Sequence, residues 1–289
     1  MISFRYHLVS MAAVLLALAA GIALGAGPLD DNNVLSSDGG EGSSADPAIA
    51  RFESGYAART SGALLKDVLK GRSVVVMTLP GARAEETKGI RADIEKAGAD
   101  ITGEVQLTGK LVDPANRQFA EGVAQQSAAD VKGVTDAGES YGRIGAALGR
   151  SVLGDGGKNL DTTATTIGSA FDEGQLLNYA AKPERFADLA VVVSGPGRAG
   201  DSGSVSAQLA KAIDGSGRGA VLAGPSTSSQ DGGVLAELRD SDAASQVSTV
   251  DVTDTAAGRV VVSLALAREA KGQSGSWGTA RSADGAVPR

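Results

Sequence analysis

The longest uninterrupted apolar stretch of the chain lies at its N-terminus. Residues 8–29 carry no charged side chain, whereas Arg5 precedes them and two aspartates follow. A helix over residues 8–26 would measure about 28 Å, because each residue adds ~1.5 Å, and this is close to the thickness of a bilayer's hydrocarbon core. The pattern predicts a single transmembrane anchor over residues 1–29, with the N-terminus in the cytoplasm because Arg5 favours that side.

A cleaved secretory signal is the alternative interpretation of this segment. Such signals have an apolar core of about 7–15 residues and a cleavage site with small residues. The apolar run here is longer, and its Ala17-Leu18-Ala19 site lies in the middle of the run. The pattern therefore favours an uncleaved anchor in the cell membrane, and both interpretations place the rest of the chain outside the cytoplasm.

The predicted anchor also offers a surface for helix association. Four small residues recur every four positions and share one face of the helix: Ala13, Ala17, Gly21 and Gly25. Small residues let two backbones approach closely, and the last two form a GxxxG pair. This face is a candidate for self-association in the membrane, although an alanine-rich segment also produces such spacing by chance.

Two segments separate the anchor from the first predicted strand. Residues 30–45 are rich in Gly and Ser and predict a flexible linker. Residues 46–71 begin with Asp-Pro, the pattern of an N-cap followed by proline at the first helical position, and predict a short stalk helix. Ile49, Phe52 and Tyr56 give this helix an apolar stripe, which is too short for a self-sufficient coiled coil.

Beyond the stalk, β-branched apolar runs alternate with segments of helical periodicity. The expected strands are residues 73–79, 101–107, 175–179, 189–194, 219–223 and 247–252. The expected helices are residues 84–97, 167–173, 205–213, 234–238 and 255–271, one that begins at residue 113, and one around residues 141–148. Residues 151–166 predict a Gly/Thr-rich break, and residues 272–289 a polar tail that is loose except around Trp277.

Alternating strands and helices predict parallel βαβ units. The expected fold of residues 72–271 is therefore an extracytoplasmic α/β domain with a Rossmann-like, doubly wound, mostly parallel sheet. The pattern leaves one alternative open, since residues 260–262 could begin a strand rather than continue a helix.

The available side chains restrict the chemistry of the external domain. The chain has no Cys, its single His is His7 in the head of the anchor, and Met77 is the only methionine beyond the anchor. Copper and zinc sites use thiolate, imidazole or thioether ligands, so we expect no metal site there. We also expect no cofactor and no enzymatic activity, because no Ser-His-Asp or Cys centre can form. The net charge of −7 does not favour nucleic acid.

Two local features remain as candidate sites. Gly195, Gly197 and Gly200 match GxGxxG between a strand and a helix, which is the context of a phosphate-binding turn. The next strand ends without an acidic residue to hold a ribose, so a tight turn explains the glycines equally well. Trp277, the only tryptophan, either packs onto the domain or contacts a partner.

A set of segments spread along the chain carries a family resemblance: the MISFRYH block with the apolar run after it, residues 71–82, 186–196 and 248–267, and the Trp277-Gly278-Thr279 motif. Together they resemble the actinobacterial MctB-like family of copper-transport outer-membrane proteins. The resemblance implies a role in copper homeostasis or efflux. Members of the family typically carry a longer charged coiled-coil segment after the anchor, and here the linker and short helix stand in its place.

Three functions are compatible with these features. The first is a component of copper homeostasis or efflux, although direct copper ligation by this chain is not expected. The second is an envelope scaffold or a regulator of cell-wall assembly and cell separation, which would act through an envelope or division protein as partner. The third is a ligand-binding sensor that uses the carboxyl ends of the strands.

Overall fold

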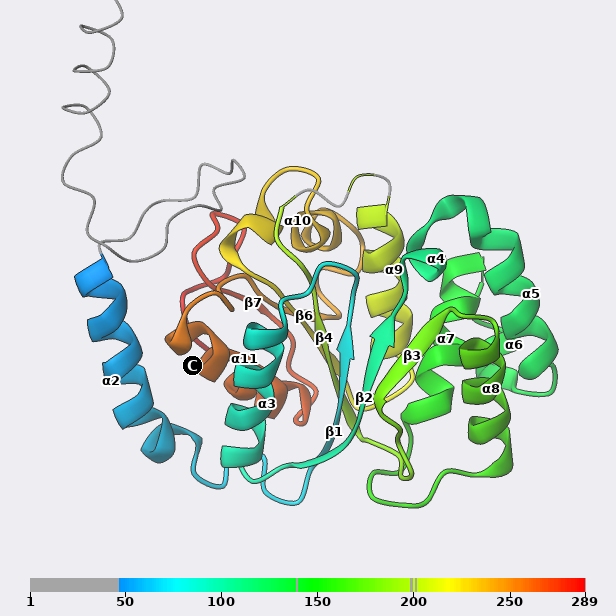
Figure 1. The fold of residues 1–289 in the computed structure, drawn as a ribbon, viewed down its shortest axis with the longest axis horizontal. Helices are drawn as coiled ribbons and strands as arrows, with labels where there is room; N and C mark the ends of the chain where they lie inside the picture. The colour runs from blue at the N-terminus through cyan, green and yellow to red at the C-terminus, as the bar shows by residue number, and fades with distance from the viewer. Residues whose placement is uncertain (1–46, 139, 198–199, 201, 289) are drawn as a thin grey trace, which may run out of the picture. The chain divides into compact units, whose positions relative to one another are not determined.

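A computed structural model describes residues 47–138, 140–197, 200 and 202–288. A seven-stranded sheet lies at the centre of this part of the chain (Figure 1). Its strands are β1 (Ser73–Thr78), β2 (Asp100–Leu107), β3 (Leu177–Ala181), β4 (Leu189–Val193), β5 (Ala220–Ala223), β6 (Ser248–Val250) and β7 (Ser276–Trp277). The predicted α/β class with a mostly parallel sheet is confirmed.

The strands lie in the order β3-β2-β1-β4-β5-β6-β7, and β2 with β3 is the single antiparallel pair. The chain places β2 and β3 on one side of β1 and then crosses to place β4 on the other side. The winding direction therefore reverses between β1 and β4, the point at which open α/β sheets commonly bind ligands. β3 is antiparallel because the chain re-enters the sheet beside the end of β2, where the backbone N–H of Thr108 donates to the carbonyl of Leu176 (3.1 Å).

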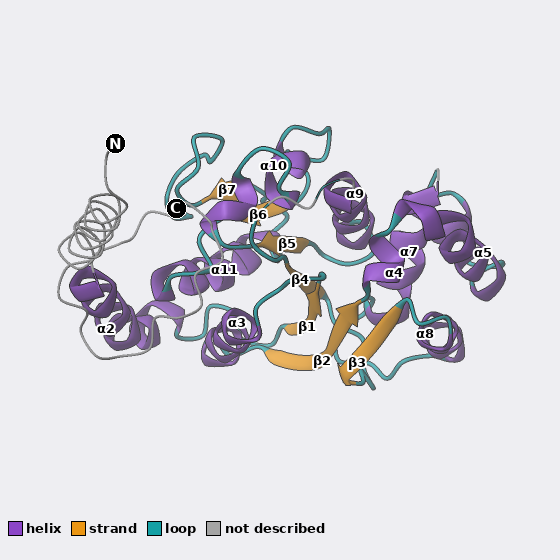
Figure 2. Ribbon diagram, turned by 45° about the horizontal axis from the view of Figure 1, so that its top comes forward, coloured by secondary structure: helices purple, strands orange, loops and turns teal. Residues whose placement is uncertain are grey.

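Helices cover both faces of the sheet (Figure 2). One face carries α2 (Pro47–Leu65), α3 (Ala84–Lys96) and α11 (Ala256–Glu269). The other carries α4 (Gly109–Val112), α5 (Arg117–Ser127), α6 (Lys132–Thr135), α7 (Ser140–Val152), α8 (Thr162–Glu173), α9 (Ser202–Asp214) and α10 (Val234–Arg239). Two 3-10 turns, η1 (Pro114–Asn116) and η2 (Ser226–Ser229), complete the set of helical segments in the described residues.

The central strands are buried on both faces, as their continuous β-branched runs predict. In β1, Val75 and Met77 contribute to one core, whereas Val74 and Val76 contribute to the other. Successive side chains of a strand point to opposite faces, so a strand covered on both sides needs apolar residues throughout. Residues 260–262 belong to α11, which decides the alternative left open by the sequence.

The predicted break over residues 151–166 is wrong at both of its ends. α7 continues to Val152, and α8 begins already at Thr162. The early start follows from capping, because the Asp161 carboxylate accepts a hydrogen bond from the backbone N–H of Ala164 (2.7 Å). Only the short segment between the two helices is a loop.

The C-terminal tail, residues 272–288 of which are described, is packed rather than loose. β7 adds to the sheet beside β6, and the backbone N–H of Gly278 donates to the carbonyl of Gly285 (3.0 Å). The Asp284 carboxylate also accepts from the backbone N–H of Ser276 (2.8 Å). The Gly/Ser-rich composition suggests flexibility, but these long-range hydrogen bonds hold the segment in place.

The stalk helix is shorter than predicted and is packed along the domain. α2 ends at Leu65, and Asp67 follows it with a φ of 59°, outside the helical region. Ala57, Ser61 and Leu65 are the buried residues of α2, the helix packs against α11 and α3, and the backbone N–H of Ala257 donates to the Glu53 carboxylate (2.8 Å). α2 is therefore part of one face of the domain.

The predicted anchor, its small-residue face and the linker lie outside the described residues. Among the helices that the structure does describe, none combines the length and the apolar character needed to cross a bilayer.

Candidate functional site

The carboxyl ends of β1 and β4 form the point where a doubly wound sheet would hold a ligand. Gly81 follows β1 and Gly195 follows β4, and a Cβ on Gly195 would lie 2.5 Å from the backbone carbonyl carbon of Gly81. The two loops therefore touch at this point. Close packing therefore requires glycine at position 195, because any side chain there would collide with the backbone of Gly81.

The other glycines of the GxGxxG segment also have a conformational role. Gly197 has a φ of 76°, and its backbone N–H donates to the Thr227 hydroxyl (3.1 Å). Gly200 has a φ of 55°, and its carbonyl accepts from the N–H of Gly203 at the start of α9. Both conformations suit a tight strand-to-helix turn, and the phosphate-binding alternative stays a prediction.

The hydroxyl-rich loop after β5 lies beside this turn and is hydrogen-bonded within the protein. The backbone N–H and hydroxyl of Ser226 both donate to the Asp254 carboxylate (3.2 and 2.8 Å), and the Ser228 hydroxyl donates to the Pro225 carbonyl (2.6 Å). The Ser194 hydroxyl at the end of β4 is buried and has no hydrogen-bond partner among the described residues. Most polar groups of this loop thus stabilise the loop itself.

No cluster of three or more His, Cys, Asp or Glu side chains in the described part of the chain is arranged to hold a metal ion. Met77, the one methionine beyond the predicted anchor, is fully buried in the core.

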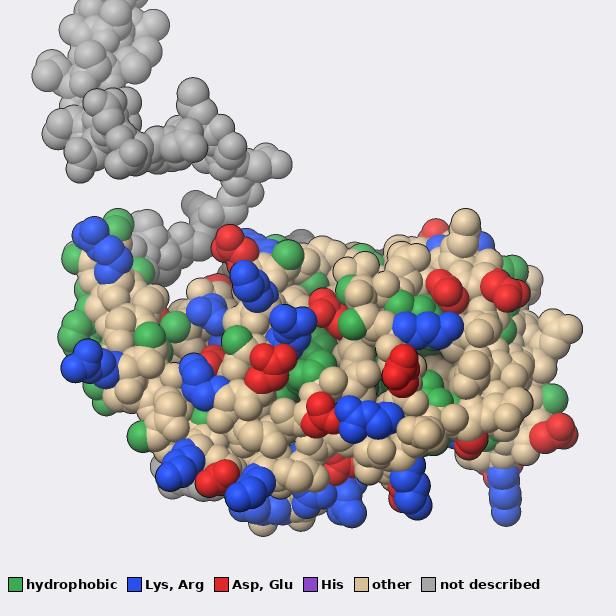
Figure 3. Space-filling view, turned by 60° about the horizontal axis from the view of Figure 1, so that its bottom comes forward, with side chains coloured by type: hydrophobic (Ala, Val, Ile, Leu, Met, Phe, Trp, Pro, Cys, Tyr) green, Lys and Arg blue, Asp and Glu red, His purple; other side chains and the backbone are tan. Residues whose placement is uncertain are grey.

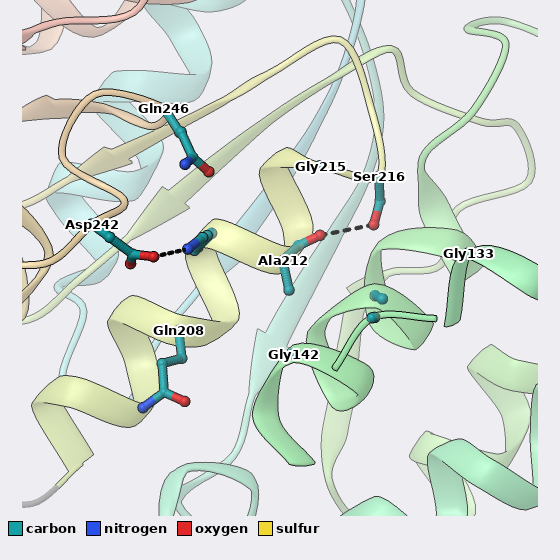
Figure 4. Close-up of a pocket in the computed structure, with 11 residues that line it drawn as sticks. Gly133, Gly142, Gln208, Ala212, Gly215, Ser216, Asp242 and Gln246 are labelled. Carbon is teal, nitrogen blue, oxygen red and sulfur yellow. Dashed lines mark hydrogen bonds and ion pairs between the residues drawn. The ribbon is translucent and has the colours of Figure 1, made fainter. Parts of the chain in front are cut away.

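A cleft of about 590 Å³ lies between α9 on one side and α6 and α7 on the other. Gln208, Asp242 and Gln246 contribute polar groups to one side of it, and the other side has only glycine and alanine, including Gly133 and Gly142 (Figure 4). Figure 4 also shows the ion pair that Asp242 forms with the Lys211 ammonium group (2.8 Å). The cleft offers amide and ionic groups but no nucleophile with an adjacent base.

The strongest electrostatic feature of the domain is a buried ion pair. Arg239 ends α10 and Asp251 follows β6; their side chains are 3% and 0% exposed and lie 2.7 Å apart. The Arg239 guanidinium also donates to the Thr249 hydroxyl (2.8 Å). The second oxygen of Asp251 accepts from the backbone N–H and the hydroxyl of Thr279 (2.7 and 3.1 Å). The pair therefore connects the sheet to the C-terminal tail.

The Trp277-Gly278-Thr279 motif contains the residues of the tail that contact the Arg239–Asp251 pair. Trp277 is 5% exposed and packs in the core beside α11, with the Arg268 guanidinium 5.7 Å from the centre of its ring. Gly278 has a φ of 136°, and a Cβ there would collide with the Asp251 carboxylate. The structure thus places Trp277 inside the domain, in the arrangement that the packing alternative describes.

α2 presents an exposed apolar stripe on the side that does not face α11. Ile49, Phe52 and Tyr56 are 63%, 74% and 63% exposed, and the two aromatic rings stack with centroids 6.3 Å apart. Leu64 adds to the exposed apolar surface nearer the end of the helix. In Figure 3, hydrophobic side chains lie along the left edge of the molecule, on the surface of α2.

The family of copper transport outer membrane proteins, MctB, matches residues 1–288 of this chain. The chain belongs to the MctB family. The resemblance seen in the sequence is thereby confirmed. Among curated proteins, the copper transporters MctB of Mycobacterium tuberculosis (strain ATCC 25618 / H37Rv) and Mycobacterium leprae (strain TN) are each 29% identical to it. Each match covers 92% of this chain and 92% of the relative.

Sequence reasoning missed the most ordered polar site of this MctB-family domain. Arg239 and Asp251 lie at the ends of neighbouring elements, and the local pattern around Arg239 does not distinguish it from a surface charge. One available signal was Asp251 directly after a buried β-branched run, since a charge at such a position needs a partner. The cleft lined by Gln208 and Gln246 was missed because amide side chains are common on helix surfaces.

Proposed function

We propose that this chain is a membrane-anchored, non-enzymatic protein of the cell envelope that contributes to copper homeostasis through contacts with other proteins. Membership of the MctB family supports the copper-related role. The predicted anchor over residues 1–29 supports a location in the cell membrane with the α/β domain outside the cytoplasm.

The apolar stripe of α2 is the observation that carries this proposal. Ile49, Phe52 and Tyr56 are exposed on a helix whose opposite side is packed against α11. Contiguous exposed apolar groups are typical of interaction sites, and spacing of three and four residues suits packing against another helix. In the sequence this helix follows the predicted anchor and linker, so a partner in the same membrane would meet it first.

Copper is the substrate of this proposed role, and the chain's own donor set explains why partners are needed. Outside the predicted anchor the chain has no thiol and no imidazole, and its one thioether, Met77, is buried in the core. Thiolate, imidazole and thioether groups are the ligands that bind copper in proteins. We therefore assign the ion's passage to an assembly that includes this chain, formed through the small-residue face of the anchor, the α2 stripe or both.

The stripe also favours a second candidate function, that of a scaffold in cell-wall assembly or cell separation. A scaffold needs a rigid surface that a partner can recognise, and α2 provides one without any catalytic group nearby. The two candidates differ in what fails when the contact is lost, namely copper balance in the first and septation in the second.

One experiment separates them: a strain that lacks the gene, complemented with the wild-type chain or with variants. We expect deletion to raise cellular copper content, and the double substitution Phe52→Ser, Tyr56→Ser to leave that defect uncorrected. Phe119→Ser on α5 is the matched control, since Phe119 is also an exposed aromatic residue (45%), and it should restore normal copper content. Unchanged copper content with defective septation in the deletion strain would favour the scaffold; unchanged copper content with normal septation would contradict both.

A further inference from the structure

A second, smaller pocket lies between the C-terminal end of β3 and the N-terminal half of α8, two elements that pack side by side (Figures 1 and 2). Its volume is about 350 Å³, at the lower end of the range for small-molecule sites. Val152, Leu160 and Ala164 give it an apolar lining, while Tyr179, Lys182 and Glu184 contribute polar groups. An apolar pocket with a few polar groups is the usual composition of a binding site.

The segment that carries the two charged residues has a fixed backbone. Lys182 and Glu184 flank Pro183, which is buried against β2 where Gly103 leaves room for its ring. The carbonyl of Glu184 accepts a hydrogen bond from the backbone N–H of Leu160, on the opposite side of the pocket (3.0 Å). Both charges are therefore held at the pocket by a segment that cannot move freely.

These two charges have no counter-ion among the described residues. Neither Lys182 nor Glu184 forms an ion pair with any described residue, and both are exposed. The Lys182 ammonium lies 5.6 Å from the centre of the Tyr179 ring, beside the pocket. A simple anion would pair with the lysine but be repelled by the glutamate, whereas a ligand with both charges would satisfy the two groups.

Tyr179 adds a hydrogen-bond donor at the same place. Its hydroxyl lies over α8 at Gly168, where a Cβ would be only 2.6 Å away, so the glycine makes room for the phenol. Burial raises the pKa of Tyr179 to about 12, and the nearby Asp172 carboxylate adds to the effect. The phenol therefore stays protonated at neutral pH and can donate to a carboxylate.

We propose that this pocket binds a zwitterionic amino acid or short peptide. The ligand's carboxylate would face Lys182 and the Tyr179 hydroxyl, its ammonium group would face Glu184, and its side chain would lie against Val152 and Ala164. This site is separate from the α2 stripe, so its test does not depend on the proposed envelope role.

Calorimetric titration of the full-length chain with the dipeptide alanyl-alanine, in its L,L and D,D forms, tests the proposal. We expect at least one form to bind, and its N-acetylated and C-amidated derivatives to bind about tenfold more weakly, because each derivative lacks one charged contact. Lys182→Gln and Glu184→Gln should each weaken binding of the free dipeptide to a similar extent. Lys66→Gln and Glu85→Gln are matched controls, since both residues are exposed and neither lines the pocket.

Thr165→Trp, at an exposed position of α8 that lines the pocket, should abolish binding by filling it without disturbing the core. Absence of binding of either dipeptide to the wild-type chain would overturn the proposal. So would equal affinity for the free and the capped dipeptides, or binding that survives both charge substitutions and Thr165→Trp.

Discussion

Glu269, which is buried, and Asp214, which is half-buried, show how single carboxyl groups set the domain's response to pH. The Glu269 carboxylate accepts hydrogen bonds from the backbone N–H (3.0 Å) and the hydroxyl of Ser248, and Asp214 accepts from the backbone N–H of Ala220 (2.6 Å). Burial raises the pKa of Glu269 to about 7 and that of Asp214 to about 6, and repulsion between the two adds to the first shift. Neither carboxyl forms an ion pair within the described residues.

Glu269→Gln should make the free energy of unfolding less dependent on pH. Because the pKa of Glu269 is raised from its ordinary 4.5, the folded chain keeps a proton that the unfolded chain loses between about pH 4.5 and 7. The wild-type chain should therefore lose stability as pH rises through this window, by on the order of 1–2 kcal/mol after solvent screening. Urea unfolding at pH 5 and pH 7.5 measures the difference. An equal loss in the wild type and in Glu269→Gln would contradict the assignment, and Glu85→Gln, at an exposed position, serves as control.

At the scale of elements, glycines set the distance between α7 and α9. A Cβ at Gly145 of α7 would lie 2.6 Å from the Ala212 Cβ and 3.1 Å from the Leu209 carbonyl oxygen. Backbone atoms cannot move away as a flexible side chain can. The two helices therefore pack at a distance that is possible only because Gly145 carries a hydrogen atom in place of Cβ. This pair of helices also forms the base of the cleft with Gln208.

Gly145→Ala should destabilise the domain by about 1–3 kcal/mol, because the added methyl group forces the two helices apart. Gly122→Ala on α5 is the matched control, since no atom lies within 4 Å of the position of its Cβ. Alanine there should be neutral or stabilise by up to about 1 kcal/mol, through its higher helix propensity. Urea midpoints of the two variants provide the test, and equal shifts would show that close packing is not the cause.

The sequence predicts elements well where one local signal dominates. β1 and β4 are continuous β-branched runs, and the structure has them at the expected places. The start of α8 was missed because Asp161 acts as a cap through its side chain, and the surrounding Thr and Gly residues suggested a loop. β3 was placed two residues early, and its antiparallel direction depends on where α8 ends, which local periodicity does not report.

At the scale of the whole molecule, the buried Arg239–Asp251 pair joins three segments, namely α10, the end of β6 and the C-terminal tail. The Asp251 carboxylate forms an ion pair with the Arg239 guanidinium at the end of α10 and accepts a hydrogen bond from the backbone N–H of Thr279 in the tail. β7 then extends the sheet beside β6, and Trp277 covers the adjacent core. The last part of the chain is thus a component of the central layer.

Asp251→Asn should lower the free energy of unfolding by about 3–5 kcal/mol, because the Arg239 charge is left buried without its partner. It should also increase hydrogen exchange in residues 276–285. Asp242→Asn removes the charge that pairs with Lys211, and the Asp242 side chain is 82% exposed. This substitution should change the free energy of unfolding by less than ~1 kcal/mol. Urea unfolding and amide exchange of both variants measure the effects. Similar losses in the two variants would refute the central role of the buried pair.

The candidate sites were less predictable than the fold for a physical reason. Each combines residues from distant elements, as when Lys182 and Glu184 meet the helix that carries Thr165, or when Gln208 of α9 meets Gln246. Such residues are ordinary in their local context, and only the packed sheet brings them together. The predicted anchor is the opposite case, because its hydrophobic pattern is local and the prediction needs no tertiary structure.

The position of β7 after every other strand has a consequence for the order of synthesis. Trp277, Thr279 and Asp284 are made later than the strands that they complete, yet they pair with β6 and cover the Asp251 carboxylate. Until residues 276–285 emerge from the ribosome, β6 lacks this neighbour and the Arg239–Asp251 pair stays open to water. The sheet is therefore complete only after this segment has been synthesised and has docked.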